Sequence, residues 1–85
     1  MEILVVNDSK AQYFMKPQTF NTVAEGERSF KQAVQTPEST FHAFPEDFTL
    51  VHIAEFDEKT GEIQVLENPV IVTNGAACLE QPNQN

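Results

Sequence analysis

The clearest pattern of hydrophobic and polar positions lies in residues 44–65 and predicts a β-hairpin. Successive side chains of a strand point to opposite faces. Residues 48–56 are apolar on both faces, which indicates a central strand covered on both sides. At period two, one face of this strand is expected to carry Phe48, Leu50, Ala54 and Phe56, and the other Val51 and Ile53. Pro45 cannot donate a ladder hydrogen bond, so the strand is expected to begin after it.

A tight turn is expected at residues 57–60, whose composition is typical of a type I turn. Gly61 follows at the position where a residue with positive φ closes a hairpin. The chain then returns as a second strand through Val65. Further along, Asn68 and Pro69 are expected to break the chain before residues 70–73, which form a separate last strand at a sheet edge.

Two segments near the start of the chain are predicted to be extended. Residues 1–6 form an apolar run that predicts a buried strand. Residues 10–17 mix aromatic side chains with two lysines, and Pro17 disfavours a helix in this arm.

One helix is predicted between Thr22 and Thr36. Thr22 and Glu25 have the spacing of a capping box, and Pro37 disfavours helical geometry in the residue before it. The core stripe of this helix consists of Val23, Gly26, Phe30, Ala33 and Val34. Glycine inside a helix costs about 1 kcal/mol relative to alanine, so Gly26 is expected to mark a close approach of helix to sheet. Residues 37–44 are a connector that Phe41 and Phe44 anchor to the core.

Together these elements predict an α+β fold, in which one small, mainly antiparallel sheet packs against one helix. The alternative is a small open β-barrel with the helix plugging one end. We expect a single domain at residues 1–79 and a disordered tail at residues 80–85. A chain of 85 residues buries only about two thirds of its unfolded surface, and the last strand leaves an apolar edge. A homodimer is therefore expected.

The net charge of −8 is unevenly distributed. Residues 1–42 carry four cations and five acids, whereas residues 43–85 carry one cation and eight acids. Such acidity disfavours nonspecific binding to nucleic acid and leaves only a local patch in the first half. There is no apolar run long enough to span a membrane, so we expect neither a membrane span nor a secretory leader; a single cysteine, Cys78, suits a reducing cytoplasm.

No catalytic, metal or cofactor motif is recognised in the sequence. His42 and His52 have no cysteine or acid at a familiar ligand spacing, so no metal site is predicted. His52 is expected to be a hydrogen-bonded histidine within the sheet, and Cys78 to be inert. The sequence therefore predicts a protein that is not an enzyme and needs no cofactor.

Two features are candidates for binding. The helix carries cations on the face opposite the core stripe, which suits phosphates or a protein partner. The extended arm places aromatic side chains between lysines, which suits single-stranded nucleic acid. The predicted nucleic-acid-binding residues are Lys10, Tyr13, Lys16, Arg28 and Lys31. The alternatives are an ordinary solvated helix face with a Glu27–Lys31 pair and an arm whose apolar residues belong to the core.

Several blocks of sequence, in this order and spacing, resemble a known family. They are residues 8–14 followed by Pro17, residues 28–30 with Ala33 and Val34, residues 45–50, and residues 55–57 with residues 60–62. Over nearly the whole chain up to Gly75, this pattern is similar to the small nonstructural protein of gokushoviruses, which are single-stranded DNA phages of the microvirus group. The resemblance implies a non-enzymatic, often DNA-binding protein of the infected bacterial cytoplasm, absent from the virion. It also implies a role in moving the phage from double-stranded replication to single-stranded genome synthesis and packaging.

Three functions remain open from the sequence. The first is an accessory factor for single-stranded DNA synthesis and packaging that contacts phage or host replication and packaging proteins and, weakly, DNA. The second is a plain single-stranded DNA-binding protein. The third is an assembly or scaffolding adaptor that uses the acidic hairpin to bind a basic phage protein.

Overall fold

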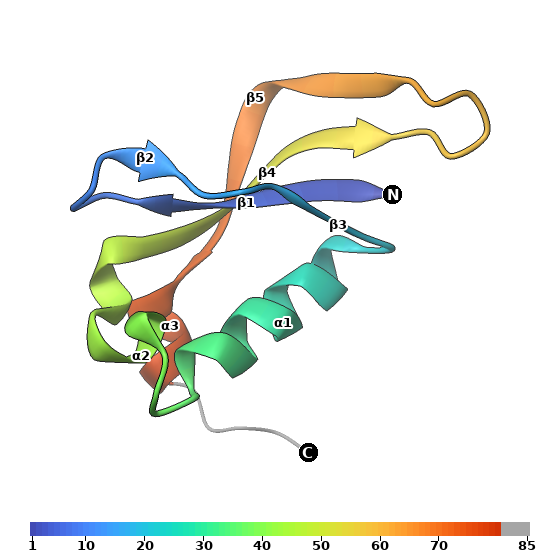
Figure 1. Ribbon diagram of the computed structural model, residues 1–85. Helices are drawn as coiled ribbons and strands as arrows, with labels where there is room; N and C mark the ends of the chain where they lie inside the picture. The colour runs from blue at the N-terminus through green and yellow to red at the C-terminus, as the bar shows by residue number, and fades with distance from the viewer. Residues whose placement is uncertain (81–85) are drawn as a thin grey trace.

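The computed structural model describes residues 1–80 and shows one antiparallel sheet with helices packed against one of its faces (Figure 1). The strands are β1 (Glu2–Asp8), β2 (Tyr13–Phe14), β3 (Gln18–Phe20), β4 (Phe48–Phe56) and β5 (Ile63–Asn74). The helices are α1 (Val23–Val34), α2 (Thr40–Ala43), the 3-10 turn η1 (Pro45–Asp47) and α3 (Gly75–Glu80). The strand order is β2-β1-β4-β5, and β3 also pairs with β1. The sheet stays open and does not close into a barrel, so the α+β prediction is confirmed.

Helix α1 forms where the sequence predicts it. The Thr22 hydroxyl accepts a hydrogen bond from the Glu25 N–H at 3.1 Å, and the helix ends at the C-cap residue Gln35. Gly26 is buried, and a Cβ atom at this position would lie 3.0 Å from side-chain atoms of Leu4 and Phe20. The predicted close approach of helix to sheet is therefore confirmed.

The core lies between α1 and the sheet. Its buried members come from the first strand, the long helix, the central strand and the last helix: Leu4, Phe30, Val34, Phe48, Leu50 and Cys78. Phe41 of α2 packs between the rings of Phe30 and Phe48, with centroid distances of 5.6 and 4.5 Å. The prediction that Phe44 is a second anchor is wrong, because Phe44 is exposed.

The hairpin between β4 and β5 has the predicted turn. The Asp57 carboxylate accepts a hydrogen bond from the Lys59 N–H at 2.8 Å, and the Gly61 N–H donates to the Asp57 carbonyl at 2.7 Å. Gly61 has φ of +78°, as predicted. The turn forms because the aspartate side chain satisfies local backbone donors and glycine supplies the left-handed conformation.

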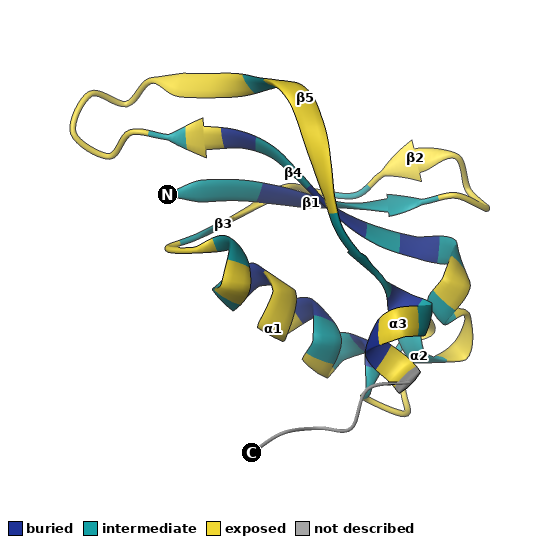
Figure 2. Cartoon of the chain, turned by 180° about the vertical axis from the view of Figure 1, so that it is seen from behind, coloured by how far each residue is buried: buried dark blue, intermediate teal, exposed yellow. Residues whose placement is uncertain are grey.

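The return strand and the last strand are one element, which corrects the sequence prediction. Strand β5 is continuous through Asn68 and Pro69, and its register against β4 shifts between Leu50 and Val51 and again between His52 and Ala54. Pro69 is tolerated because β5 is at the edge of the sheet, where one side of the strand needs no partner. Most of β5 is exposed (Figure 2).

A second correction concerns the two faces of β4. Leu4 pairs with His52 and Ile3 pairs with Ala54, so Ile53 is an extra residue in β4. Such a bulge moves the residues beyond it to the opposite face. The prediction that Ala54 and Phe56 share the face of Phe48 and Leu50 is therefore wrong; Ala54 is buried, but outside the core beneath α1.

The C-terminal end of the described chain is helical. Helix α3 closes at Glu80, and most of the predicted tail, residues 81–85, lies outside the described residues. Among residues 1–80 there is no helix long and apolar enough to cross a membrane.

Candidate nucleic-acid interface

The arm that carries Lys10, Tyr13 and Lys16 is fixed to the sheet. The Asp8 carboxylate accepts hydrogen bonds from the backbone N–H groups of Lys10 and Ala11, both at 3.1 Å. Ser9 is tied to η1, because its N–H donates to the Asp47 carbonyl at 2.9 Å. After β2, the Met15 N–H donates to the Val6 carbonyl at 2.8 Å. The arm is thus an ordered turn followed by a short strand that pairs antiparallel with β1.

The aromatic side chains of this arm face solvent. Tyr13 is 51% exposed and Phe14 is 60% exposed, although both belong to β2. Lys10 lies in the preceding turn and Lys16 directly after the strand, and both are exposed. Tyr13 and Phe14 are consecutive residues of the strand and point to opposite faces of the sheet. An exposed ring beside exposed cations suits stacking of a base and neutralisation of phosphates. The alternative, in which Phe14 and Met15 are core residues, is wrong for Phe14 but holds for Met15, which is partly buried and packs against the core.

A pocket of about 620 Å³ lies between the arm, β1 and α1. Its walls are mainly apolar, and polar groups of Lys16, Gln18 and Ser29 also line it. Tyr13 and Lys16 reach it from the arm, while Ser29 and Phe30 reach it from α1. An apolar pocket with a few polar groups suits a flat ring that also carries hydrogen-bonding atoms. A nucleobase is such a group.

The two helix cations lie away from this pocket. Arg28 is exposed on α1 and does not line the pocket. Lys31 is half-buried on the flank of α1 that faces α3, where its charge acts on the Cys78 thiol. One turn further along α1, the Gln35 side chain donates a hydrogen bond to the Cys78 carbonyl of α3 at 3.1 Å, so this flank contacts α3 there as well. The structure therefore brings Tyr13 and Lys16 together but not Lys16 and Lys31.

The β1–β2 turn and the β4–β5 hairpin lie at opposite ends of β1 (Figure 1). The β1–β2 turn carries Lys10, whereas the other end of β1 lies beside the β4–β5 hairpin. A second pocket of about 500 Å³ lies there, and its acidic lining residues are Glu2, Glu55, Asp57, Glu58 and Glu62. Acidic residues also lie beside the arm: Asp8, the last residue of β1, accepts a hydrogen bond from the Lys10 N–H, and Ser9 is bonded to η1, which carries Glu46 and Asp47.

Sequence reasoning missed the pocket residues contributed by the core elements. Ser29 and Phe20 belong to segments with ordinary helix and strand patterns, and nothing in their local sequence marks a pocket. The sequence also did not predict that Glu2, His52 and Glu55 lie together. The His52–Glu55 spacing is visible in the sequence, but on a regular strand these two side chains would point to opposite faces.

Comparison with known proteins gives one match. The family model described as Phage ORF5 protein matches residues 1–78, which is nearly the whole chain. No curated protein and no solved structure matches the chain.

Proposed function

Because this chain belongs to the Phage ORF5 protein family, we propose that it is a non-enzymatic phage accessory protein that promotes single-stranded genome synthesis and packaging over double-stranded replication. It acts in the cytoplasm of the host bacterium, through phage or host replication and packaging proteins and through weak contact with single-stranded DNA. The phage family and the resemblance to gokushovirus nonstructural proteins support this role.

The observation that carries the DNA contact is the exposure of Tyr13 between Lys10 and Lys16. Stacking of a base on an aromatic ring contributes about 1–3 kcal/mol, and every base offers a face for it. Nearby lysines neutralise phosphates. A net charge of −8 opposes accumulation of the protein along a strand, so the contact is local and transient.

Fluorescence anisotropy with a labelled oligothymidine tests this contact. The double variant Tyr13→Ala, Lys16→Glu is expected to lose at least about tenfold in affinity, because it removes a stacking ring and reverses a charge. Lys59→Glu is the matched control, because it makes the same charge change at the hairpin turn and is expected to bind like wild type. Equal affinity of the double variant and the control would contradict the proposed interface.

A genetic measurement tests the role itself. In cells infected with phage that lacks this protein, the ratio of single-stranded to double-stranded genome is expected to fall. An unchanged ratio with normal yield of packaged genome would contradict the proposed function. A fall in the ratio that the DNA-binding double variant fully restores would indicate action through a protein partner alone.

The acidic end is the part that we assign to protein contacts. The acids beside the β4–β5 hairpin offer a surface complementary to a basic phage protein. Charge reversal of Glu58 and Glu62 is expected to leave DNA affinity intact and to reduce phage growth. Normal growth of that variant would remove the assignment.

A further inference from the structure

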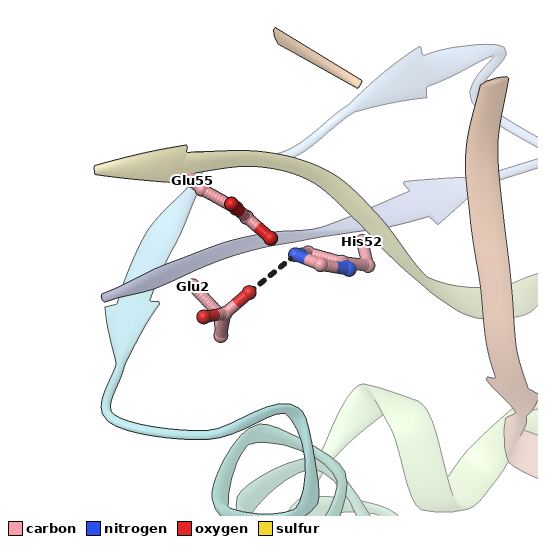
Figure 3. A group of neighbouring side chains, drawn as sticks. All are labelled: Glu2, His52 and Glu55. Carbon is pink, nitrogen blue, oxygen red and sulfur yellow. Dashed lines mark ion pairs between the residues drawn. The ribbon is translucent and has the colours of Figure 1, made fainter. Parts of the chain in front are cut away.

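We propose that Glu2, His52 and Glu55 bind a divalent transition-metal ion of the Zn²⁺ class. The three side chains come from β1 and β4 and point toward one another (Figure 3). One potential ligand atom from each residue lies within 4.8 Å of the other two. The site is independent of the proposed DNA contact, because it lies at the other end of β1.

The β4 bulge creates this cluster. Glu2 pairs directly with Glu55 across the two strands, and opposite residues of an antiparallel pair share a face. Leu4, two residues after Glu2, pairs with His52 on the same face. Without the extra residue Ile53, His52 and Glu55 would point to opposite sides of the sheet. The bulge thus serves to collect three metal-binding side chains on one face.

The His52 ring nitrogen is the strongest sign of a ligand. His52 Nε2 lies 2.9 Å from Glu2 Oε1, and the His52 side chain is only 12% exposed. The contact is an ion pair when the imidazole is protonated, yet the buried Nε2 atom makes no hydrogen bond of acceptable geometry to the carboxylate (Figure 3). A close nitrogen–oxygen contact therefore exists without a well-placed shared proton.

A metal ion fits this geometry better than a hydrogen bond. A proton must lie near the line between the two atoms, whereas a zinc ion bound to both at about 2.1 Å lies about 45° off that line. Glu55 is exposed, so its side chain is free to complete the coordination by a small rotation. One imidazole nitrogen and two carboxylates also neutralise a divalent charge.

The donor set selects the class of ion. Imidazole nitrogen suits Zn²⁺ and neighbouring transition metals, while Mg²⁺ prefers oxygen ligands and retains water. Three protein ligands leave at least one coordination position for water or for a partner's side chain. Glu2 and Glu55 also line the acidic pocket of about 500 Å³, which attracts cations to the site. The bound ion would join the first strand to the central strand.

Calorimetric titration of the tag-free protein with ZnCl₂ at constant pH tests the site. We expect saturable binding of one ion per chain and a Tm that rises by roughly 5 °C at saturation. MgCl₂ at the same concentration is expected to change neither signal. Absence of saturable Zn²⁺ binding would overturn the proposal.

Matched variants distinguish Zn²⁺ binding at this site from nonspecific attraction of the ion to acidic residues. Glu55→Gln removes one ligand at an exposed position, where the fold tolerates the change, and should weaken Zn²⁺ binding at least about tenfold. Glu58→Gln removes the same charge from the same pocket outside the cluster and should bind like wild type. Equal affinities of these two variants would also overturn the proposal. Co²⁺ substitution gives an independent readout, since the visible absorption of a low-coordinate Co²⁺ site should disappear in Glu55→Gln.

Discussion

Gly75 lies so close to Pro45 that a Cβ atom on residue 75 would come within 2.3 Å of the Pro45 carbonyl oxygen. Gly75 is the first residue of α3. Asn74, the residue before it, is hydrogen-bonded to the segment around the start of β4. The Asn74 side-chain amide donates to the carbonyls of Glu46 and Phe48 at 3.2 and 3.1 Å. The start of α3 is therefore fixed against the start of β4.

Gly75→Ala is expected to reduce the free energy of unfolding by at least about 2 kcal/mol, because a backbone carbonyl cannot move aside as a side chain can. Urea unfolding followed by circular dichroism measures the change. Ala77→Ser, on the exposed side of the same helix, should change stability by no more than about 0.5 kcal/mol. A Gly75→Ala protein as stable as wild type would show that the two segments are not packed as described.

Gly61→Val should destabilise the protein by more than about 1 kcal/mol. The loss of stability comes from the backbone conformation alone, because Gly61 has φ of +78° and nothing lies within 4 Å of a Cβ atom at this position. Gly61→Asn is the matched control and should lose less, since asparagine tolerates the left-handed region. Equal thermal stability of Gly61→Val and wild type would remove the turn assignment.

Binding to single-stranded DNA is expected to depend only weakly on salt. The first half of the chain carries four cations, Lys10, Lys16, Arg28 and Lys31. Even if all four contact phosphates, the slope of log affinity against log salt concentration should be no steeper than about −3 per chain. The anisotropy titration repeated across a series of NaCl concentrations measures it. A steeper slope would indicate a larger cationic surface than one chain provides.

The free edge of β5 is expected to mediate a homodimer. Within residues 1–80 no strand pairs with its outer side, and Val65 and Ile71 on it are 78% and 71% exposed. Light scattering at tens of micromolar should give twice the chain mass. Val65→Lys with Ile71→Lys should give the monomer without unfolding, while Leu79→Lys on α3 should stay dimeric. A monomer mass for wild type would contradict this expectation.

Stability should fall at alkaline pH through Cys78. Burial raises the pKa of the Cys78 thiol above its ordinary value of 9.0; the Thr73 hydroxyl, 3.8 Å from the sulfur, and Lys31 counteract this, whereas Glu27 adds to it. The folded state therefore holds this proton more tightly than the unfolded chain does. Its contribution to stability is complete below pH 9.0 and is lost as pH rises through the folded-state pKa.

Urea unfolding at a series of pH values from 8 upward tests this effect. The free energy of unfolding of wild type should decline with pH more steeply than that of Cys78→Ala, which lacks the thiol. Cys78→Ala removes only the thiol and keeps every other titratable side chain, so the difference between the two curves reports the thiol. Parallel curves would show that the thiol makes no such contribution.

The sequence by itself determined the elements whose causes are local. Thr22 caps α1 because its hydroxyl reaches an amide three residues away, and Pro37 lies just beyond the helix end. The Asp57 carboxylate and Gly61 build the hairpin turn within a few residues. The glycine in the core stripe of α1 also identified the close approach of helix and sheet, because a glycine there has no local advantage.

Only the tertiary structure decided the features that depend on pairing between distant segments. The bulge at Ile53 is set by the pairing of β4 with β1, and the continuity of β5 through Pro69 by its pairing with β4; neither pairing leaves a mark in the local pattern. A shift of one residue moves every later side chain to the other face, and so it alone brought Glu2, His52 and Glu55 together. Likewise, the packing of α3 against α1 placed Lys31 away from the arm. In the sequence, Lys31 and the lysines of the arm are equally suitable cations.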